Sequence, residues 1–151
     1  MRIQFYPSDE LEDKLNKEAD ALGVNVSVLV NDLLNKHYGL VPPDAMSDAQ
    51  IEQLVISEIK DYIKDPNHTD EFDLNMGSQT YSKIEMIYAG KPRILKARLG
   101  KTFAKLIGTG EFKHVEQVML SNGKPKRTVG NRAALYIINW AKRSAEETQN
   151  E

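Results

Sequence analysis

The chain of 151 residues contains no cysteine, only one tryptophan and no long uninterrupted apolar run. The lack of cysteine excludes disulfide bonds, thiolate metal sites, iron–sulfur clusters and cysteine nucleophiles. No stretch approaches the roughly 20 apolar residues that a membrane-spanning helix needs, and the first residues lack the apolar core of a secretion signal. We therefore expect a cytoplasmic protein whose 40% apolar content is sufficient for a packed core.

The formal net charge of −2 conceals an uneven distribution of charge along the chain. Residues 91–143 contain 13 Lys and Arg against 2 Asp and Glu, whereas residues 41–90 contain 3 against 10. Electrostatic fields act over a Debye length of about 8 Å at physiological salt, so the basic segment attracts polyanions whatever the whole-chain charge is. The alternative is a solvated basic face that folds against the acidic middle of the chain.

The first forty residues show the pattern of one strand and two helices. Polar and apolar residues alternate over residues 2–6, which predicts a short strand that Pro7 ends. Apolar residues at helical spacing predict a helix over about 9–22, with Ser8 as its cap and Gly23 as its stop. A second helix over about 26–38 begins after Asn25.

Residues 1–40 offer too little surface to form a stable core alone, so we expect them to associate with a second copy. The Pro-rich segment 41–46 is interpreted as a linker to a second module. The pattern Arg2-Ile3-Gln4-Phe5, the helix that ends at Gly23 and the apolar stripe that follows Asn25 resemble the ribbon-helix-helix family of Arc, MetJ and CopG-type repressors.

The resemblance implies a homodimer whose paired N-terminal strands enter the major groove of DNA. Base-reading residues would then be Arg2 and Gln4, with Tyr6 at the edge, because Arg suits guanine and Gln suits adenine. Ile3 and Phe5 would face the core. The resemblance also implies a phosphate clamp at the start of the second helix, formed by Asn25, Val26 and Ser27. The strand has almost no basic arm before it, so the module could instead serve dimerisation only.

The remaining chain predicts a basic winged helix-turn-helix-like α+β domain over 47–143 and a flexible tail over 144–151. The fold class is therefore mainly α with short strands. The expected elements, in order, are a helix over 48–64, a short strand around 72–76, helices over 78–88 and 92–108, and strands over 114–120 and 134–138, joined by a basic loop over 121–132. Residues 99–103 resemble part of a small winged-helix-like bacterial domain of unknown function.

Phosphate contacts are expected on the helix that begins at Pro92 and on the basic loop. A rotation of about 100° per residue separates the apolar face of that helix from Arg98, Lys101 and Lys105. The loop adds four further cations, namely Lys124, Lys126, Arg127 and Arg132. The alternative is an α+β domain whose basic face binds protein or RNA.

No enzymatic pattern, cofactor site or metal site is predicted. Gly100-Lys101-Thr102 lacks the preceding glycine and strand that a phosphate loop needs. The three histidines have no zinc-ligand spacing, and the acidic stretch around His68 does not match the calcium-loop pattern.

The sequence therefore predicts a sequence-specific DNA-binding protein that acts as a dimer on a palindromic site. A transcriptional repressor or a plasmid or mobile-element regulator fits this description, and a relaxosome accessory protein would show the same features. The alternative from another class is an antitoxin-like interaction module, whose C-terminal segment would fold only on a partner.

Overall fold

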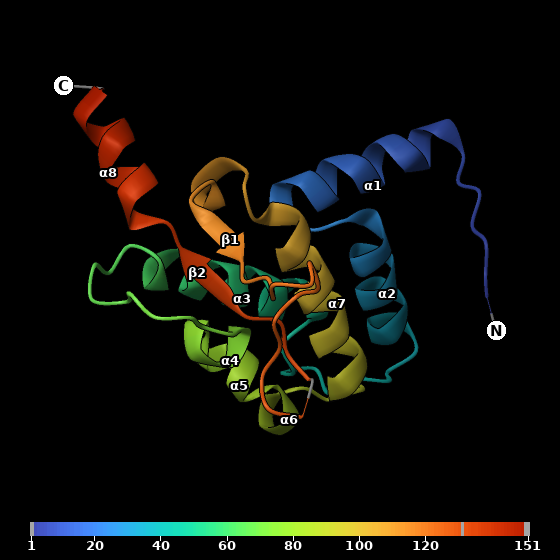
Figure 1. The fold of residues 1–151 in the computed structure, drawn as a ribbon. Helices are drawn as coiled ribbons and strands as arrows, with labels where there is room; N and C mark the ends of the chain where they lie inside the picture. Colours follow the sequence, from blue (N-terminus) through green and yellow to red (C-terminus); the bar gives the residue numbers. More distant parts are fainter. Residues whose placement is uncertain (1, 131, 150–151) are drawn as a thin grey trace.

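The computed structural model describes residues 2–130 and 132–149. The fold is mainly helical and includes a small two-stranded antiparallel sheet (Figure 1). In chain order the elements are α1 (Asp9–Leu22), α2 (Val26–His37), α3 (Asp48–Tyr62), α4 (Leu74–Gly77), α5 (Gln79–Ser82), α6 (Ile84–Ile87), α7 (Pro92–Leu106), a 3-10 turn η1 (Gly110–Phe112), β1 (Val115–Gln117), β2 (Tyr136–Ile138) and α8 (Trp140–Gln149).

The two N-terminal helices begin and end close to the expected residues because their terminal signals are local. Gly23 ends α1 in the left-handed conformation, with φ of 67°, which costs glycine little. The Asn25 side chain accepts a hydrogen bond from the Val28 amide and caps α2. Leu15, Ala19 and Leu29 bury their side chains between the two helices.

Residues 2–6 form no strand within the described single chain; the strand expected here needs a second copy to pair with, so it stays a prediction. They precede α1 and extend away from the body (Figure 1), and both Ile3 and Phe5 are exposed. A strand requires a hydrogen-bonding neighbour, and the single chain offers none to this segment among its described residues.

The predicted linker does not separate the N-terminal helices from the rest of the chain. Val24 and Val28 pack against Ala49 on α3 in one buried cluster. Both carboxylate oxygens of Asp32 on α2 accept backbone hydrogen bonds at the start of α3, from the amides of Asp48 and Ala49 at 2.9 Å. Segment 41–46 therefore connects two packed parts.

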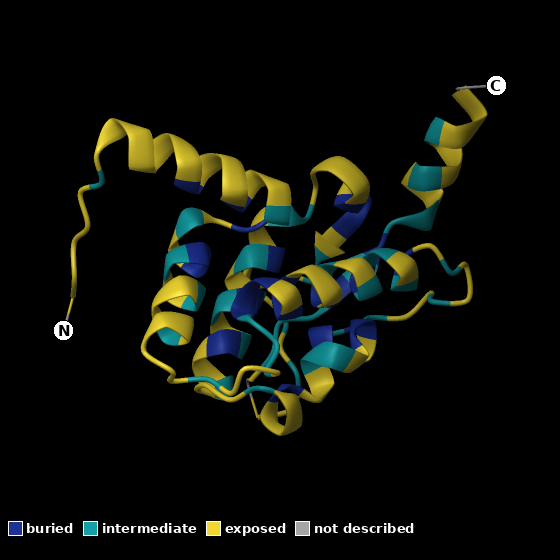
Figure 2. Cartoon of the chain, turned by 180° about the vertical axis from the view of Figure 1, so that it is seen from behind, coloured by how far each residue is buried: buried dark blue, intermediate teal, exposed yellow. Residues whose placement is uncertain are grey.

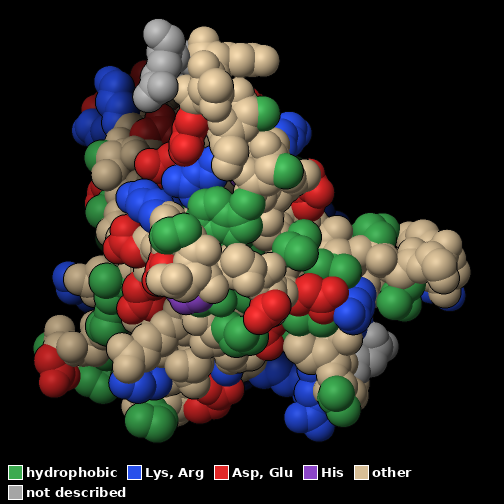
Figure 3. Space-filling model, turned by 60° about the vertical axis from the view of Figure 1, so that its left-hand side comes forward, with side chains coloured by type: hydrophobic (Ala, Val, Ile, Leu, Met, Phe, Trp, Pro, Cys, Tyr) green, Lys and Arg blue, Asp and Glu red, His purple; other side chains and the backbone are tan. Residues whose placement is uncertain are grey.

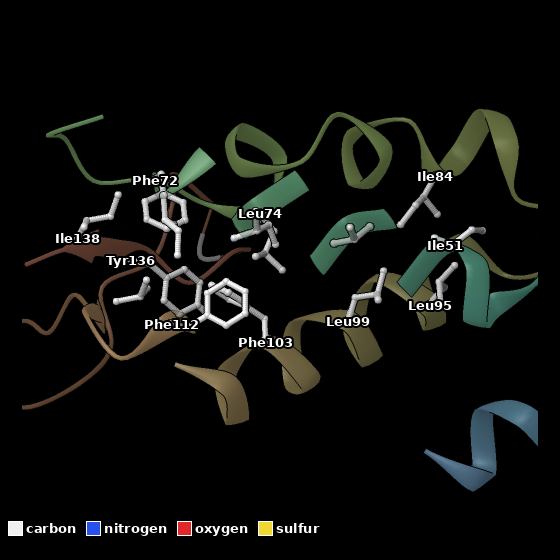
Figure 4. Packing of buried hydrophobic residues seen from close by; sticks show 14 residues of the cluster. Ile51, Phe72, Leu74, Ile84, Leu95, Leu99, Phe103, Phe112, Tyr136 and Ile138 are labelled. Atoms are coloured by element: carbon white, nitrogen blue, oxygen red, sulfur yellow. The ribbon is translucent and has the colours of Figure 1, made fainter. Parts of the chain in front are cut away.

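The main core lies between α3, α7 and the sheet (Figure 4). Phe103 on α7 meets Phe112 and Tyr136 edge to face, at ring-centroid distances of 5.3 and 4.8 Å. Leu95 and Leu99 continue this buried face of α7, as its spacing predicts. These contacts fix the direction of α7 and therefore determine which of its side chains reach solvent.

Two predictions for residues 72–88 are wrong. Phe72 forms only a single bridge to Tyr136 rather than a strand, and α4 begins two residues later because the Asp73 side chain caps it. The helix expected over 78–88 is divided into α5 and α6 at Lys83, whose φ of −102° and ψ of 6° are not helical.

The C-terminal tail is helical instead of flexible over its described residues. The Trp140 indole donates to the His68 carbonyl at 3.0 Å, and the Arg143 guanidinium donates to the Ile63 carbonyl at 2.9 Å. These contacts hold the first turns of α8 against α3 and the loop that follows it. Residues 150 and 151 of the predicted tail lie outside the described residues.

Candidate nucleic-acid interface

Helix α7 presents a solvent-exposed stripe opposite its buried face. Lys101 and Lys105 are exposed on this stripe, as the helical spacing predicts. Ala97 and Ala104 are also exposed there, so small side chains lie next to the two lysines on this stripe. An exposed helix that has small side chains beside lysines is able to approach a phosphate backbone closely.

Arg98, which was predicted to contact phosphate, forms an ion pair with Asp48 on α3. The Asp48 side chain is buried, so the guanidinium compensates a carboxylate that has little contact with water. Positions 98 and 101 differ by about 60° around the helix, which is enough to turn Arg98 toward α3. Arg98 is therefore not part of the exposed stripe.

Sequence reasoning missed the cations at the start of α7. Lys91 and Arg93 are both exposed, next to the largely exposed Ile94. Arg93 lies one turn before Ala97 on the same stripe. The helical spacing that predicts an exposed Lys101 extends to Arg93 in the first turn of the helix.

The basic loop between β1 and β2 folds back on itself. The Asn-Gly signal is confirmed as a tight turn, in which the Gly123 amide donates to the Leu120 carbonyl. Gly123 has a positive φ of 78°. Further backbone hydrogen bonds join Lys126 to Val118 and Leu135. The strands are shorter than predicted because the chain changes its pairing partner within this loop.

The four predicted loop cations differ in their surroundings. Lys126 binds both carboxylate oxygens of Glu71, at 2.9 and 2.7 Å, and so fastens the loop to the body. Lys124, Arg127 and Arg132 are exposed. Asn131, also in the loop, lies outside the described residues.

The predicted base-reading residues Arg2, Gln4 and Tyr6 are all exposed in the N-terminal segment. The Tyr6 hydroxyl donates to the Gln4 amide oxygen at 3.0 Å, so these two side chains point to one side of the segment. Ile3 and Phe5, predicted to face a core, are 77% and 57% exposed. The single chain therefore gives the apolar side of this segment no cover.

The predicted phosphate clamp lies at the start of α2. Asn25 uses its side-chain oxygen as the helix cap, Ser27 is exposed and Val26 packs partly against the small core between α1 and α2. The first backbone hydrogen bond of α2 is donated by the Val28 amide to the Asn25 carbonyl. The amides of Val26 and Ser27 come before it and therefore have no acceptor within the helix.

The side of the molecule that carries α8 shows acidic, basic and hydrophobic side chains interspersed (Figure 3). Such a mixed surface does not concentrate potential of one sign.

Carboxylates concentrate near the contact between α2, α3 and α7. Burial raises the pKa of Asp32, although two backbone amides donate to its carboxylate and lower the pKa in part. Burial also raises the pKa of Glu52, against the opposing influence of Arg98. Burial and a hydrogen bond to Asp48 raise the pKa of Tyr88. The one arginine in this group is thus outnumbered by acidic side chains.

Replacing Glu52 with glutamine is expected to stabilise the fold at pH 8 by about 1 kcal/mol, because an ionised buried carboxylate without a partner is costly. Its folded pKa lies above the usual 4.5, so the native chain holds this proton more tightly than the unfolded chain does. The contribution of Glu52 to stability therefore falls as pH rises above about 4.5, and the difference from Glu52→Gln disappears once pH is below the pKa of Glu52 in both states, at about pH 4. Urea unfolding at both pH values tests this; equal stabilities at pH 8 would contradict it.

The acidic stretch around His68 is not assembled as a cation site. His68 stacks on Tyr62 at a ring-centroid distance of 3.7 Å, Glu71 binds Lys126 and Asp73 caps α4. Within residues 2–130 and 132–149, no group of three or more His, Asp and Glu side chains is placed to hold a metal ion. In the same residues, no helix has both the length and the apolar character required to cross a bilayer.

Comparison with known proteins gave no match, whether to a family model, a curated protein or a solved structure.

Proposed function

We propose that the chain is a dimeric DNA-binding regulator of the ribbon-helix-helix kind. The observation that supports this most is the uncovered apolar side of the N-terminal part. Figure 2 shows α1 and the segment before it as largely exposed. Leu33 and Leu34 at the far end of α2 are 44% and 50% exposed, and Leu11 continues the otherwise buried stripe of α1.

A second copy offers a physical reason for this exposure. The apolar stripes of α1 and α2 are covered near the Gly23 turn and uncovered toward their other ends. Two antiparallel N-terminal segments would satisfy each other's backbone groups and bring Ile3 and Phe5 over those uncovered ends. Arg2 and Gln4 would then lie on the opposite side of the paired segments, because successive strand residues alternate.

The C-terminal part supplies basic side chains for the phosphate backbone in this proposal. Helix α7 is taken as the helix that approaches DNA and the loop over 121–132 as the wing. The exposed side chains assigned to phosphate are Arg93, Lys101, Lys105, Lys124, Arg127 and Arg132. A packed core over α3, α7 and the sheet gives no support to a C-terminal segment that folds only on a partner, so we do not propose the antitoxin-like function.

Replacing Lys101 and Lys105 with alanine is expected to weaken binding to random-sequence and selected DNA duplexes equally. The slope of log affinity against log salt concentration should become shallower by about 1.8, since each lost phosphate contact removes roughly 0.9. Fluorescence anisotropy across a salt series measures both quantities. The matched control is Lys64→Ala with Lys142→Ala. It removes two exposed lysines elsewhere, one just after α3 and one on α8.

Replacing Arg2 and Gln4 with alanine should instead change the preferred sequence, with little effect on binding to random DNA. An unchanged salt slope in the lysine variant would overturn the assignment to α7. An unchanged sequence preference in the Arg2 and Gln4 variant would overturn the assignment of base reading to the N-terminal segment.

A further inference from the structure

A groove of about 560 Å³ opens between the C-terminal end of α1, one side of α3, the end of α7 and the η1 turn. Its walls thus come from the N-terminal helices and from the C-terminal core. The Gln53 side chain, which donates to the Leu22 carbonyl, holds α3 and α1 together along one wall. On α7 the groove is lined by Thr102 and Leu106, and its lining does not include Lys101 or Lys105, which are assigned to DNA.

Glu52 lines this groove from α3 and is the least satisfied charged group in it. The residue is 4% exposed, and among the described residues its Oε2 atom has no hydrogen-bond partner. Buried carboxylates are ordinarily paired or hydrogen-bonded, since an unpartnered buried charge is costly. The unpaired oxygen is therefore available to a hydrogen-bond donor that enters the groove.

The charges around Glu52 favour a positively charged donor. Arg98 influences Glu52 electrostatically, and its Nη2 atom is bonded to Asp48; among the described residues its buried Nε atom has no hydrogen-bond partner, and no hydrogen bond joins Arg98 to Glu52. Lys60, which also lines the groove, forms an ion pair with Glu111 at the edge. Asp20 adds another carboxylate to the lining. A cation that entered the groove would therefore bring the local charge closer to balance.

The remaining walls favour a partly apolar ligand. Apolar surface comes from Leu22, Ile56, Leu106 and Phe112. Thr102 on α7 adds a hydroxyl group to the lining. Binding sites for small molecules typically combine such apolar walls with a few polar groups that fix orientation. The combination suits an alkyl chain with a charged nitrogen at one end.

We propose that this groove binds a small organic cation, with its ammonium or guanidinium group at Glu52 and its alkyl part against the apolar wall. The carboxylate would accept hydrogen bonds from the nitrogen, and no covalent change is involved. This inference does not depend on the proposed DNA binding. Its occupant would contact α1 and α3 together, and therefore both the N-terminal helices and the C-terminal core.

Isothermal titration calorimetry of the full chain with n-butylammonium and n-butylguanidinium tests the proposal, with amide NMR shifts to locate binding. We expect both cations to bind and to shift the amides of Gln53 and Thr102, while 1-butanol, butyrate and potassium ions do not. Glu52→Gln should weaken the binding of both cations by about tenfold or more, because it removes a charge-assisted hydrogen bond.

Two controls keep the result specific. Glu12→Gln, which removes the same charge from an exposed position on α1, should leave the affinity unchanged. The unfolding curve of Glu52→Gln, expected to be more stable at pH 8, shows that its fold is intact. Absence of binding by either cation, equal binding of 1-butanol or potassium, undiminished binding to Glu52→Gln or shifts confined to other residues would each overturn the proposal.

Discussion

Replacing Ile3 and Phe5 together with serine is expected to dissociate the proposed dimer into monomers. Both side chains are more than half exposed in the single chain, so the substitutions remove little that a monomer needs. In the proposed dimer they remove four large apolar side chains from the shared core. At roughly 1.5 kcal/mol for each buried side chain, the loss is about 6 kcal/mol, or about 10⁴-fold in the dissociation constant.

Sedimentation velocity over a concentration series measures this change. The matched control replaces Met76 and Met86 with serine, since these residues are equally apolar and exposed but lie on α4 and α6. The control should remain dimeric. An original chain that is monomeric at every concentration, or a dimer that survives the loss of Ile3 and Phe5, would contradict the proposed association.

Replacing Arg98 with methionine is expected to lower the free energy of unfolding by about 3 kcal/mol, because Asp48 would keep a buried charge without its partner. Methionine retains most of the apolar length of the arginine stem, so the change reports mainly on the charge. Lys101→Met, on the exposed stripe of the same helix, should change stability little. Urea unfolding of the three proteins gives the comparison.

The same pair of variants separates a structural role from a DNA contact. If Arg98→Met retains full stability and loses DNA affinity as Lys101→Met does, then Arg98 contacts phosphate and the ion pair with Asp48 is unimportant. We expect the opposite pattern, in which stability is lost at position 98 and affinity is lost at position 101.

The helix boundaries that could be predicted from the sequence depend on neighbouring residues. Asn25 caps α2, and Ser47 and Gln50 form the expected capping box at the start of α3. Such caps form within a few residues and do not need the rest of the chain. For the same reason Gly23 and Pro92 identified the end of α1 and the start of α7.

The errors arise where a distant residue or a competing local contact decides the outcome. Helix α8 depends on contacts with His68 and Ile63, more than 70 residues earlier in the chain, which a polar tail sequence does not reveal. The alternation around Phe72 suggested a strand, but the Asp73 cap favoured a helical turn.

The candidate site shows the same division. Lys101 and Lys105 could be assigned to the exposed side of α7 from spacing alone, since helix geometry fixes that relation. Arg98 and Lys126 could not be distinguished from their exposed neighbours, because their partners Asp48 and Glu71 lie 50 and 55 residues away. A count of basic residues therefore overestimates how many are available to a polyanion.

The pairing of two N-terminal segments is tested most directly by a spin label at position 4. The chain has no cysteine, so Gln4→Cys provides a single attachment point in each protomer. In an antiparallel pair centred near this residue the two Cα atoms lie about 5 Å apart, which predicts strong dipolar broadening of the electron paramagnetic resonance spectrum. Dilution with unlabelled protein should remove the broadening. A sharp spectrum without dipolar coupling, from a protein shown to be dimeric, would contradict the paired segments.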